Sequence, residues 1–134
     1  MNYKDQYLQE NASYERLLRE YNQHGNLIVG FDFDGTVHDF HKIGAVHSDV
    51  IELLRDLKSI NCTLICWTAY KEHEYVIKFL EDNNIPFDGI NTNGIPLPYE
   101  TRKPFFNVLL DDRAGMIQVY KELRRLVDYI KNNK

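Results

Sequence analysis

The chain has 134 residues, of which 43% are hydrophobic and 27% charged, as is typical of one ordinary globular domain with a single core. Its net charge of −4 and its isoelectric point near 5.7 argue against nucleic acid as a default partner. No apolar run approaches the roughly 20 residues that span a membrane, and the polar start at 1–6 argues against a signal peptide, so we expect a cytoplasmic protein without membrane contact.

The first part of the chain, 1–26, is predicted to form an amphipathic helix that packs on a single-domain core over 27–134. Aromatic and leucine side chains recur over 3–23 at spacings of three, four and seven, which is typical of one helix face. These side chains are Tyr3, Tyr7, Tyr14, Leu18 and Tyr21. Gly25 is expected to end the helix. Such a stripe usually packs on its own domain, and a contact between two copies of the chain, giving a homo-oligomer, is the alternative.

The segment 27–36 begins as an apolar strand and ends in two carboxylates, a glycine and a hydroxyl. A continuous apolar run is typical of an inner strand of a parallel sheet, which is covered on both faces. Asp32 and Asp34 therefore lie at the carboxyl end of that strand, where open α/β sheets bind ligands. Gly35 allows a sharp turn and a close approach to a ligand. The alternative is a plain Asp-Gly turn, which does not need two aspartates after an apolar run.

The rest of the chain alternates between predicted helices and strands, with a polar loop at 37–47 after the first strand. The elements are a helix capped by Ser48, a strand at 62–68, a helix at 72–82, a short strand at 87–91, an irregular proline-containing stretch at 92–104, a strand at 108–110 and a helix at 115–132. This alternation predicts the α/β class, as a three-layer sandwich around a central parallel sheet. Cys62 and Cys66 are expected to be reduced core residues.

A second acidic pair, Asp111 and Asp112, follows the apolar strand at 108–110. Four acids delivered by two strand ends repel one another unless a cation lies between them, and hard oxygen ligands indicate Mg²⁺. Thr68 adds a hydroxyl at the end of a third strand. The sequence therefore predicts a site for a phosphoryl group and its magnesium ion at one edge of the sheet.

These motifs together resemble those of the haloacid dehalogenase-like (HAD) superfamily of phosphohydrolases. The Asp-x-Asp-Gly-Thr signature matches at 32–36, the strand ending in threonine matches at Thr68, and the acidic signature matches at 111–112. The resemblance implies a Rossmann-like core whose first strand is central, with the Thr68 strand on one side and the Asp111 strand on the other. The spacers 37–67 and 69–102 hold 31 and 34 residues, too few for an inserted domain of roughly 50 or more, so we expect the small type without a cap domain.

The resemblance implies a magnesium-dependent phosphatase that hydrolyses a phosphomonoester through an aspartyl-phosphate intermediate. Asp32 would be the nucleophile, and Asp34 would be the general acid for the leaving alcohol and then the base for water. Magnesium would be held by Asp32, the backbone carbonyl of Asp34, Asp111, and Asp112 directly or through water. The substrate, a phosphorylated small molecule or macromolecular end, is left open by these residues.

The resemblance also implies groups that bind the phosphate. Thr68 would donate its hydroxyl, aided by backbone N–H groups around Gly35 and Thr36. The family uses a lysine as well, and the candidate by motif is Lys103. If the strand before Asp111 begins at Phe105, its six residues to Leu110 span roughly 20 Å, which would leave Lys103 near the opposite edge of the sheet. Lys71, three residues after Thr68, is the substitute on the correct edge.

The loop 37–47 lies beside the site if the resemblance holds, so His38, His41 or Lys42 could touch the substrate. The favoured interpretation is that they are solvated loop residues. Two different functions stay open beside the phosphatase. One is a HAD-fold module that binds metal and phosphate with weak or lost catalysis. The other is a phosphoacceptor like a response-regulator receiver, although receivers carry the adjacent acids first and the acceptor later.

Overall fold

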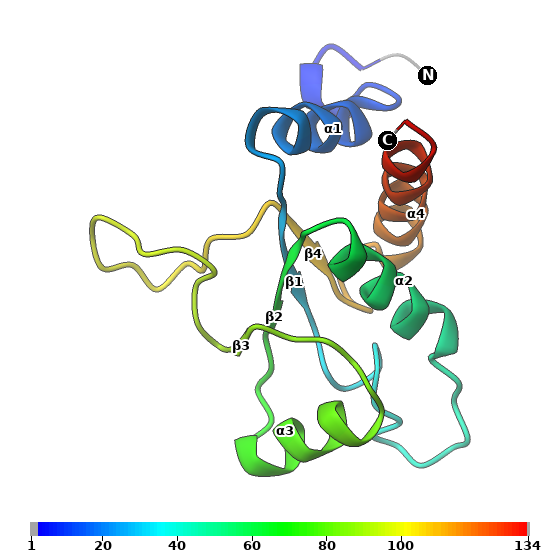
Figure 1. Ribbon diagram of the computed structural model, residues 1–134, viewed down its shortest axis with the longest axis vertical. Helices are drawn as coiled ribbons and strands as arrows, with labels where there is room; N and C mark the ends of the chain where they lie inside the picture. Colours follow the sequence, from blue (N-terminus) through cyan, green and yellow to red (C-terminus); the bar gives the residue numbers. More distant parts are fainter. Residues whose placement is uncertain (1–2, 134) are drawn as a thin grey trace.

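The computed structural model describes residues 3–133, which form a four-stranded parallel sheet flanked by four α-helices (Figure 1). In chain order the elements are the 3₁₀ turn η1 Gln6–Leu8, α1 Ala12–His24, β1 Ile28–Phe31, α2 Ser48–Ser59, β2 Thr63–Cys66, α3 His73–Asp82, β3 Gly89–Ile90, β4 Val108–Leu110 and α4 Met116–Asn132. The strand order is β3-β2-β1-β4, so β1 is an inner strand between β2 and β4. The predicted α/β class with a central parallel sheet is confirmed.

The register of the sheet brings three strand ends to one edge. Phe31, the last residue of β1, pairs with Cys66 of β2 and with Leu110 of β4. The ladder continues one residue further, because Asp32 N donates to Leu110 O at 3.0 Å and Trp67 N donates to Phe31 O at 2.8 Å. The residues that follow each strand therefore begin at the same level of the sheet.

The hydrophobic core lies between one face of the sheet and the helices. Alternate residues of the first strand and its extension, Val29, Phe31 and Phe33, are fully buried there. Each helix contributes a buried leucine to the same cluster. These are Leu17 from α1, Leu54 from α2, Leu80 from α3 and Leu123 from α4. The stripes of apolar residues predicted for α2, α3 and α4 thus face the sheet.

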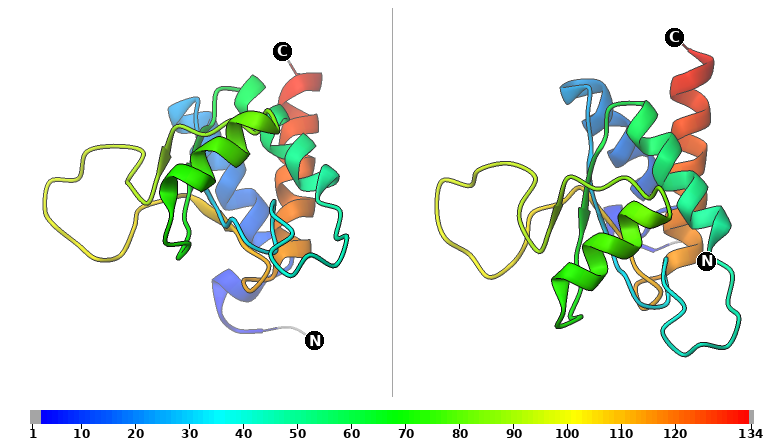
Figure 2. Two further views of the ribbon diagram at one scale, coloured as in Figure 1. Left: turned by 90° about the horizontal axis from the view of Figure 1, so that it is seen from below. Right: turned by 60° about the horizontal axis from the view of Figure 1, so that its bottom comes forward.

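The other face of the sheet is contacted by the two ends of the irregular segment 91–107, which connects β3 to β4, while the middle of the segment projects away from the helices (Figure 2). Gly94 lies so close to the sheet that a Cβ there would be 3.0 Å from Ile28 Cγ2 and 3.1 Å from Thr63 Cγ2. Gly30 in turn lies against the ring of Phe106. The third layer of the sandwich is therefore this segment, which contains no helix.

The N-terminal helix is shorter than predicted. The expected helix over 3–23 begins only at Ala12, because Asn11 adopts a left-handed conformation with φ of 69°. Tyr3 and Tyr7 are mostly exposed, so the first part of the tyrosine stripe does not pack. Residues 1–2 of the predicted N-terminal segment 1–26 lie outside the described residues.

The remainder of α1 packs on the core as predicted. Tyr14 and Tyr21 are buried, and the Tyr21 hydroxyl donates to Ile60 O at 2.7 Å. The Arg125 guanidinium lies 3.8 Å from the centre of the Tyr14 ring, which ties α1 to α4. Gly25, with φ of 70°, ends the helix as expected.

One smaller prediction is wrong: Ser48 is the first residue of α2, and His47 occupies the N-cap position without a side-chain cap. Within residues 3–133, the spacers before and after β2 hold only the elements named above and no inserted domain. None of the helices described is both long enough and apolar enough to cross a membrane.

Candidate active site

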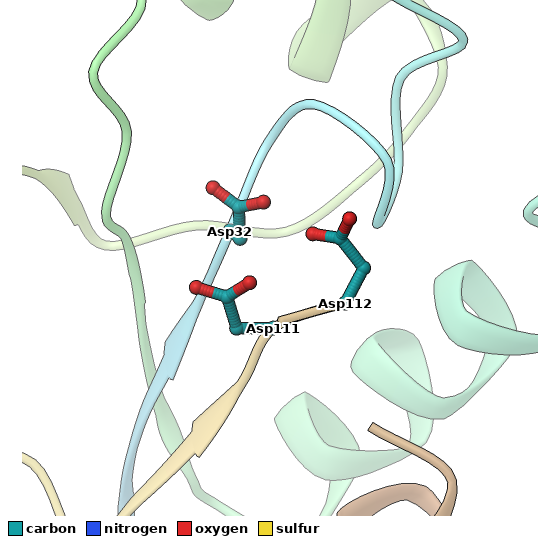
Figure 3. Close-up of side chains that lie close together, drawn as sticks. All are labelled: Asp32, Asp111 and Asp112. Carbon is teal, nitrogen blue, oxygen red and sulfur yellow. The ribbon is translucent and has the colours of Figure 1, made fainter. Parts of the chain in front are cut away.

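Three carboxylates meet where β1 and β4 end. Asp32 follows β1, whereas Asp111 and Asp112 follow β4, its parallel neighbour. One carboxylate oxygen from each side chain lies within 4.8 Å of one from each of the other two. Figure 3 shows the three side chains around a common space. The structure therefore brings together three of the four aspartates predicted to bind metal.

The electrostatics of this trio favour a cation. The pKa of Asp32 is raised from 3.8 to about 7 by burial, by a hydrogen bond with Asp112 and by the charge of Asp111. A divalent cation among the three carboxylates would relieve this repulsion. Since the donors are all hard oxygen atoms, Mg²⁺ fits the site better than a metal that prefers nitrogen or sulfur.

The raised pKa of Asp32 predicts how pH affects stabilisation by magnesium. An acid whose pKa is higher in the folded than in the unfolded state binds more protons when folded, so between about pH 4 and 7 the metal-free protein loses stability as pH rises. Magnesium requires the ionised carboxylates. We expect the rise in melting temperature on adding magnesium to be small at pH 5 and larger at pH 8. A rise of equal size at both pH values would contradict the assignment of Asp32 as a ligand.

The turn after β1 is built around Asp112. Gly35 has φ of +80°, and a Cβ on it would lie 2.7 Å from Asp112 Oδ2. Thr36 is fully buried, and its Oγ1 accepts a hydrogen bond from Asp112 N at 3.3 Å. The two residues after Asp34 therefore hold the Asp112 carboxylate next to Asp32.

The same turn corrects the predicted phosphate contacts. Gly35 N already donates to His38 O at 3.0 Å, and Thr36 N donates to Phe33 O at 3.3 Å. These two amides are not free to bind phosphate as the sequence predicted, and the buried Thr36 side chain cannot reach a ligand. Gly35 and Thr36 instead shape the turn that positions the carboxylates.

A substitution at Gly35 tests this role. Gly35→Ala is expected to lower stability by about 1–3 kcal/mol and to weaken magnesium binding, because the new methyl group displaces the Asp112 carboxylate and the backbone is strained. Gly44→Ala is a matched control, since Gly44 has φ of +79° but no atom within 4 Å of an added Cβ. Urea unfolding and magnesium titration measure both effects. Equal magnesium affinity in the two variants would contradict the proposed contact.

Asp34 stands apart from the trio and pairs with a histidine. Its Oδ1 lies 2.7 Å from His38 Nδ1, and His38 Nε2 lies 3.0 Å from the Tyr75 hydroxyl. The His38 ring stacks on Phe33, with 4.5 Å between ring centres. All partners are satisfied when Nδ1–H donates to Asp34 and the Tyr75 hydroxyl donates to Nε2. The interpretation of His38 as a solvated loop residue is therefore wrong.

Thr68 is held at the site by a residue that sequence reasoning missed. Thr68 N donates to Asn91 Oδ1 at 2.8 Å, and Asn91 Nδ2 donates to Thr68 O, also at 2.8 Å. Thr68 Oγ1 accepts a hydrogen bond from Tyr70 N at 2.9 Å, which leaves its O–H to donate to a ligand. Asn91 follows β3 directly, so it repeats the pattern of a polar residue after an apolar strand that had identified the other site residues.

The structure separates the two candidate lysines. Lys103 lines a cavity with Arg16 and Asn107, and the Asn107 side chain accepts a hydrogen bond from Ile28 N at the start of β1. Lys103 is therefore at the end of the sheet opposite the aspartates, as the strand length indicated, and it does not act in this site. Lys71 lies on the correct edge and lines a cavity together with Asp34.

That cavity has a volume of about 430 Å³ and is open to solvent. It is lined by Asp34, Phe40, Ala69, Tyr70, Lys71 and Glu72. Two larger cavities, of about 560 and 570 Å³, lie along the segment 91–107, but none of the four aspartates lines them. Of these three cavities, the one beside Asp34 is therefore the one that adjoins a predicted catalytic residue.

The two cysteines take no part in the site. Both are buried and unpaired, as predicted. Burial raises the pKa of Cys62 to about 11 and that of Cys66 to about 12, so neither forms a thiolate near neutral pH. Both are core residues: Cys62 directly precedes β2, and Cys66 is its last residue.

Comparison with known proteins shows similarity at the level of fold. No protein-family model and no curated protein matches the sequence. Among solved structures, a conserved protein from Bacteroides thetaiotaomicron superposes with a TM-score of 0.61 and 22% sequence identity. The match covers 75% of this chain and 91% of that protein. At this identity the likeness supports the α/β fold and carries no conclusion about activity.

Proposed function

We propose that this chain is a magnesium-dependent phosphatase of the HAD-like type without a cap domain, which hydrolyses a phosphomonoester through an aspartyl-phosphate. The supporting observation is the contrast between two neighbouring aspartates. Asp32 lies among the carboxylates of Asp111 and Asp112, whereas Asp34 is held apart from them by His38. Two carboxylates in different environments are what a nucleophile and a general acid require.

The carboxylates of Asp32, Asp111 and Asp112 would hold the magnesium ion. When bound, the ion neutralises negative charge that develops on the phosphoryl oxygens. The chemistry of the donors supports this assignment, since three oxygen ligands from two adjacent strand ends match the preference of Mg²⁺ for carboxylates.

The residues of the chain then divide the reaction into two displacements. In the first, a carboxylate oxygen of Asp32 attacks phosphorus, the ester P–O bond breaks, and Asp34 gives a proton to the leaving oxygen. In the second, Asp34 takes a proton from water, which attacks the aspartyl-phosphate and releases inorganic phosphate. The Thr68 hydroxyl donates to a phosphate oxygen, and Lys71 supplies positive charge from the cavity beside Asp34.

The direct test is hydrolysis of p-nitrophenyl phosphate by the purified protein with magnesium and with a chelator. We expect release of p-nitrophenol only with magnesium. The proposed substrates are phosphorylated small molecules or phosphorylated ends of macromolecules. Buried, unpaired cysteines favour the cytoplasm as the compartment in which this reaction takes place.

His38 is proposed to position Asp34, which gives a separate prediction. His38→Ala is expected to lower kcat about 10- to 100-fold, because Asp34 loses the partner that orients its carboxylate, while KM changes little. His73→Ala, in the exposed first residue of α3, is the matched control. Steady-state kinetics and melting temperatures of both variants are compared. An unchanged kcat in a folded His38→Ala protein would contradict the role.

A second candidate is a module that binds metal and phosphate without turnover. The position of Lys103 favours it, because the lysine expected from the family motif lies at the far end of the sheet. This candidate predicts that magnesium raises the melting temperature while no phosphomonoester is hydrolysed. The phosphatase predicts both effects together.

A further inference from the structure

The cavity beside Asp34 is the natural place for the leaving group of the proposed reaction. Asp34 gives its proton to the oxygen that leaves phosphorus, so whatever is attached to that oxygen must extend from Asp34. The cavity of about 430 Å³ contains Asp34 in its wall and continues along the residues that follow Thr68. Its volume lies within the range of small-molecule sites, about 300–1,000 Å³.

Two aromatic rings form the apolar part of this cavity. Tyr70 is fixed in place, because its ring stacks on Tyr75 with 5.3 Å between centres and meets Phe33 edge-on at 5.7 Å. Phe40 is 52% exposed, although it is one of the large apolar side chains next to the site. An exposed aromatic ring facing a cavity is suited to stacking with a planar group of a ligand.

The loop that carries Phe40 is held in a defined conformation. The Asp39 carboxylate accepts hydrogen bonds from the backbone N–H groups of Ile43, Gly44 and Ala45 at 3.2, 2.8 and 3.1 Å. Phe40 N donates to the carbonyl of His38, the residue that pairs with Asp34. The aromatic wall is thus connected through two residues to the proposed general acid.

The remaining part of the cavity is polar and carries both signs of charge. Lys71 and Glu72 are exposed and lie next to Tyr70 in the sequence. A carboxylate accepts hydrogen bonds from a vicinal diol, and an ammonium group donates to ring nitrogens, carbonyl groups or phosphate oxygens. The cavity therefore combines a stacking surface with hydrogen-bonding groups suited to a sugar.

We propose that the substrate is a nucleoside 5′-monophosphate, an inference that rests on the proposed phosphatase function. The phosphate binds at Asp32 and Thr68, the base stacks against Phe40 and Tyr70, and the ribose lies near Glu72. The bond between phosphorus and O5′ breaks, O5′ receives the proton of Asp34, and water then releases phosphate, so the products are a nucleoside and inorganic phosphate. A sugar phosphate has no planar ring to stack on Phe40 and Tyr70, and a small aryl phosphate would leave the charged part unused.

The test compares kcat/KM for AMP and UMP with that for glucose 6-phosphate in the presence of magnesium. We expect the nucleotides to be preferred at least tenfold. In Phe40→Ala the ratio of kcat/KM for AMP to that for glucose 6-phosphate is expected to fall about tenfold, as for loss of one base–aromatic stack. Phe40→Tyr should keep the ratio. Tyr99→Ala, which removes a ring that is 69% exposed in the segment 91–107, is the matched control and should also keep it.

The outcomes separate this inference from the proposed function. Hydrolysis of all substrates at similar efficiency, or a preference for p-nitrophenyl phosphate over nucleotides, would overturn the nucleotide assignment and leave the phosphatase intact. If no substrate is hydrolysed, the phosphatase is wrong, and calorimetry of AMP binding with magnesium decides the inference alone. Binding that Phe40→Ala weakens supports it, whereas the absence of binding, or binding equal in both proteins, overturns it.

Discussion

Replacing Asp32 with asparagine is expected to lower turnover by about 10⁴-fold or more while the protein stays folded. The amide of asparagine cannot form an acyl-phosphate by attack on phosphorus, and removal of a nucleophile that acts with other groups has effects of this order. Asp32 contributes one of three crowded carboxylates, so its neutral replacement removes repulsion from Asp111 and Asp112 and the fold is retained. Steady-state hydrolysis of p-nitrophenyl phosphate measures the loss.

The matched control is Asp82→Asn on the surface of α3. The Asp82 side chain is 58% exposed and pairs with Lys78 four residues earlier, so its replacement should leave kcat unchanged. The covalent intermediate is expected to be trapped by acid quenching during turnover of a radiolabelled substrate and to be cleaved by hydroxylamine, because acyl-phosphates persist in cold acid and react with hydroxylamine. Full activity of a folded Asp32→Asn protein would exclude the covalent mechanism.

Replacing both Asp111 and Asp112 with asparagine is expected to abolish the effects of magnesium. The double variant leaves Asp32 as a single carboxylate where three had met, and one carboxylate on a partly exposed edge binds Mg²⁺ weakly. Activity should fall by about 10³-fold or more, since charge on the phosphoryl group is no longer neutralised. The same change lowers the pKa of Asp32, because the Asp112 hydrogen bond and the Asp111 charge that raise it are gone.

This double variant also separates metal binding from folding. Without magnesium its melting temperature near pH 8 should equal or exceed that of the unaltered protein, because two repelling charges have been removed. With magnesium the unaltered protein should gain stability and the variant should not. Thermal unfolding with and without the ion provides both comparisons. A magnesium-induced rise of equal size in the two proteins would place the metal elsewhere.

Several features of the fold followed from local patterns. The apolar run before Asp32 is an inner parallel strand. Asp32, Thr68 and Asp111 follow the three adjacent strands β1, β2 and β4, as expected. Continuous burial of a strand and the period of a helix are properties of neighbouring residues, so they can be recognised without knowledge of distant contacts. One exception was also local: the left-handed conformation of Asn11 shortened the first helix.

Most residues of the candidate site could be predicted from the sequence, but the contacts between their side chains could not. Asp32, Asp111 and Asp112 came together because parallel strands end at a common edge. The separation of Asp34 from the other three carboxylates could not be predicted. It depends on the turn at Gly35, which brings His38 back to within 2.7 Å of the Asp34 carboxylate. Asn91, which pairs with Thr68, was missed although it follows β3 directly, as the aspartates follow β1 and β4.

The sequence by itself determined the α/β class, the inner first strand and the type of residue at each strand end, because these depend on spacing and polarity along the chain. Only the tertiary structure decided the partner of Asp34, the burial of Thr36 and the contact of Asn91 with Thr68. It also decided that, within residues 3–133, the two ends of the segment 91–107, and no helix, lie against the second face of the sheet. Each of these depends on turns and crossovers that bring distant residues together, and such contacts leave no periodic signal in the sequence.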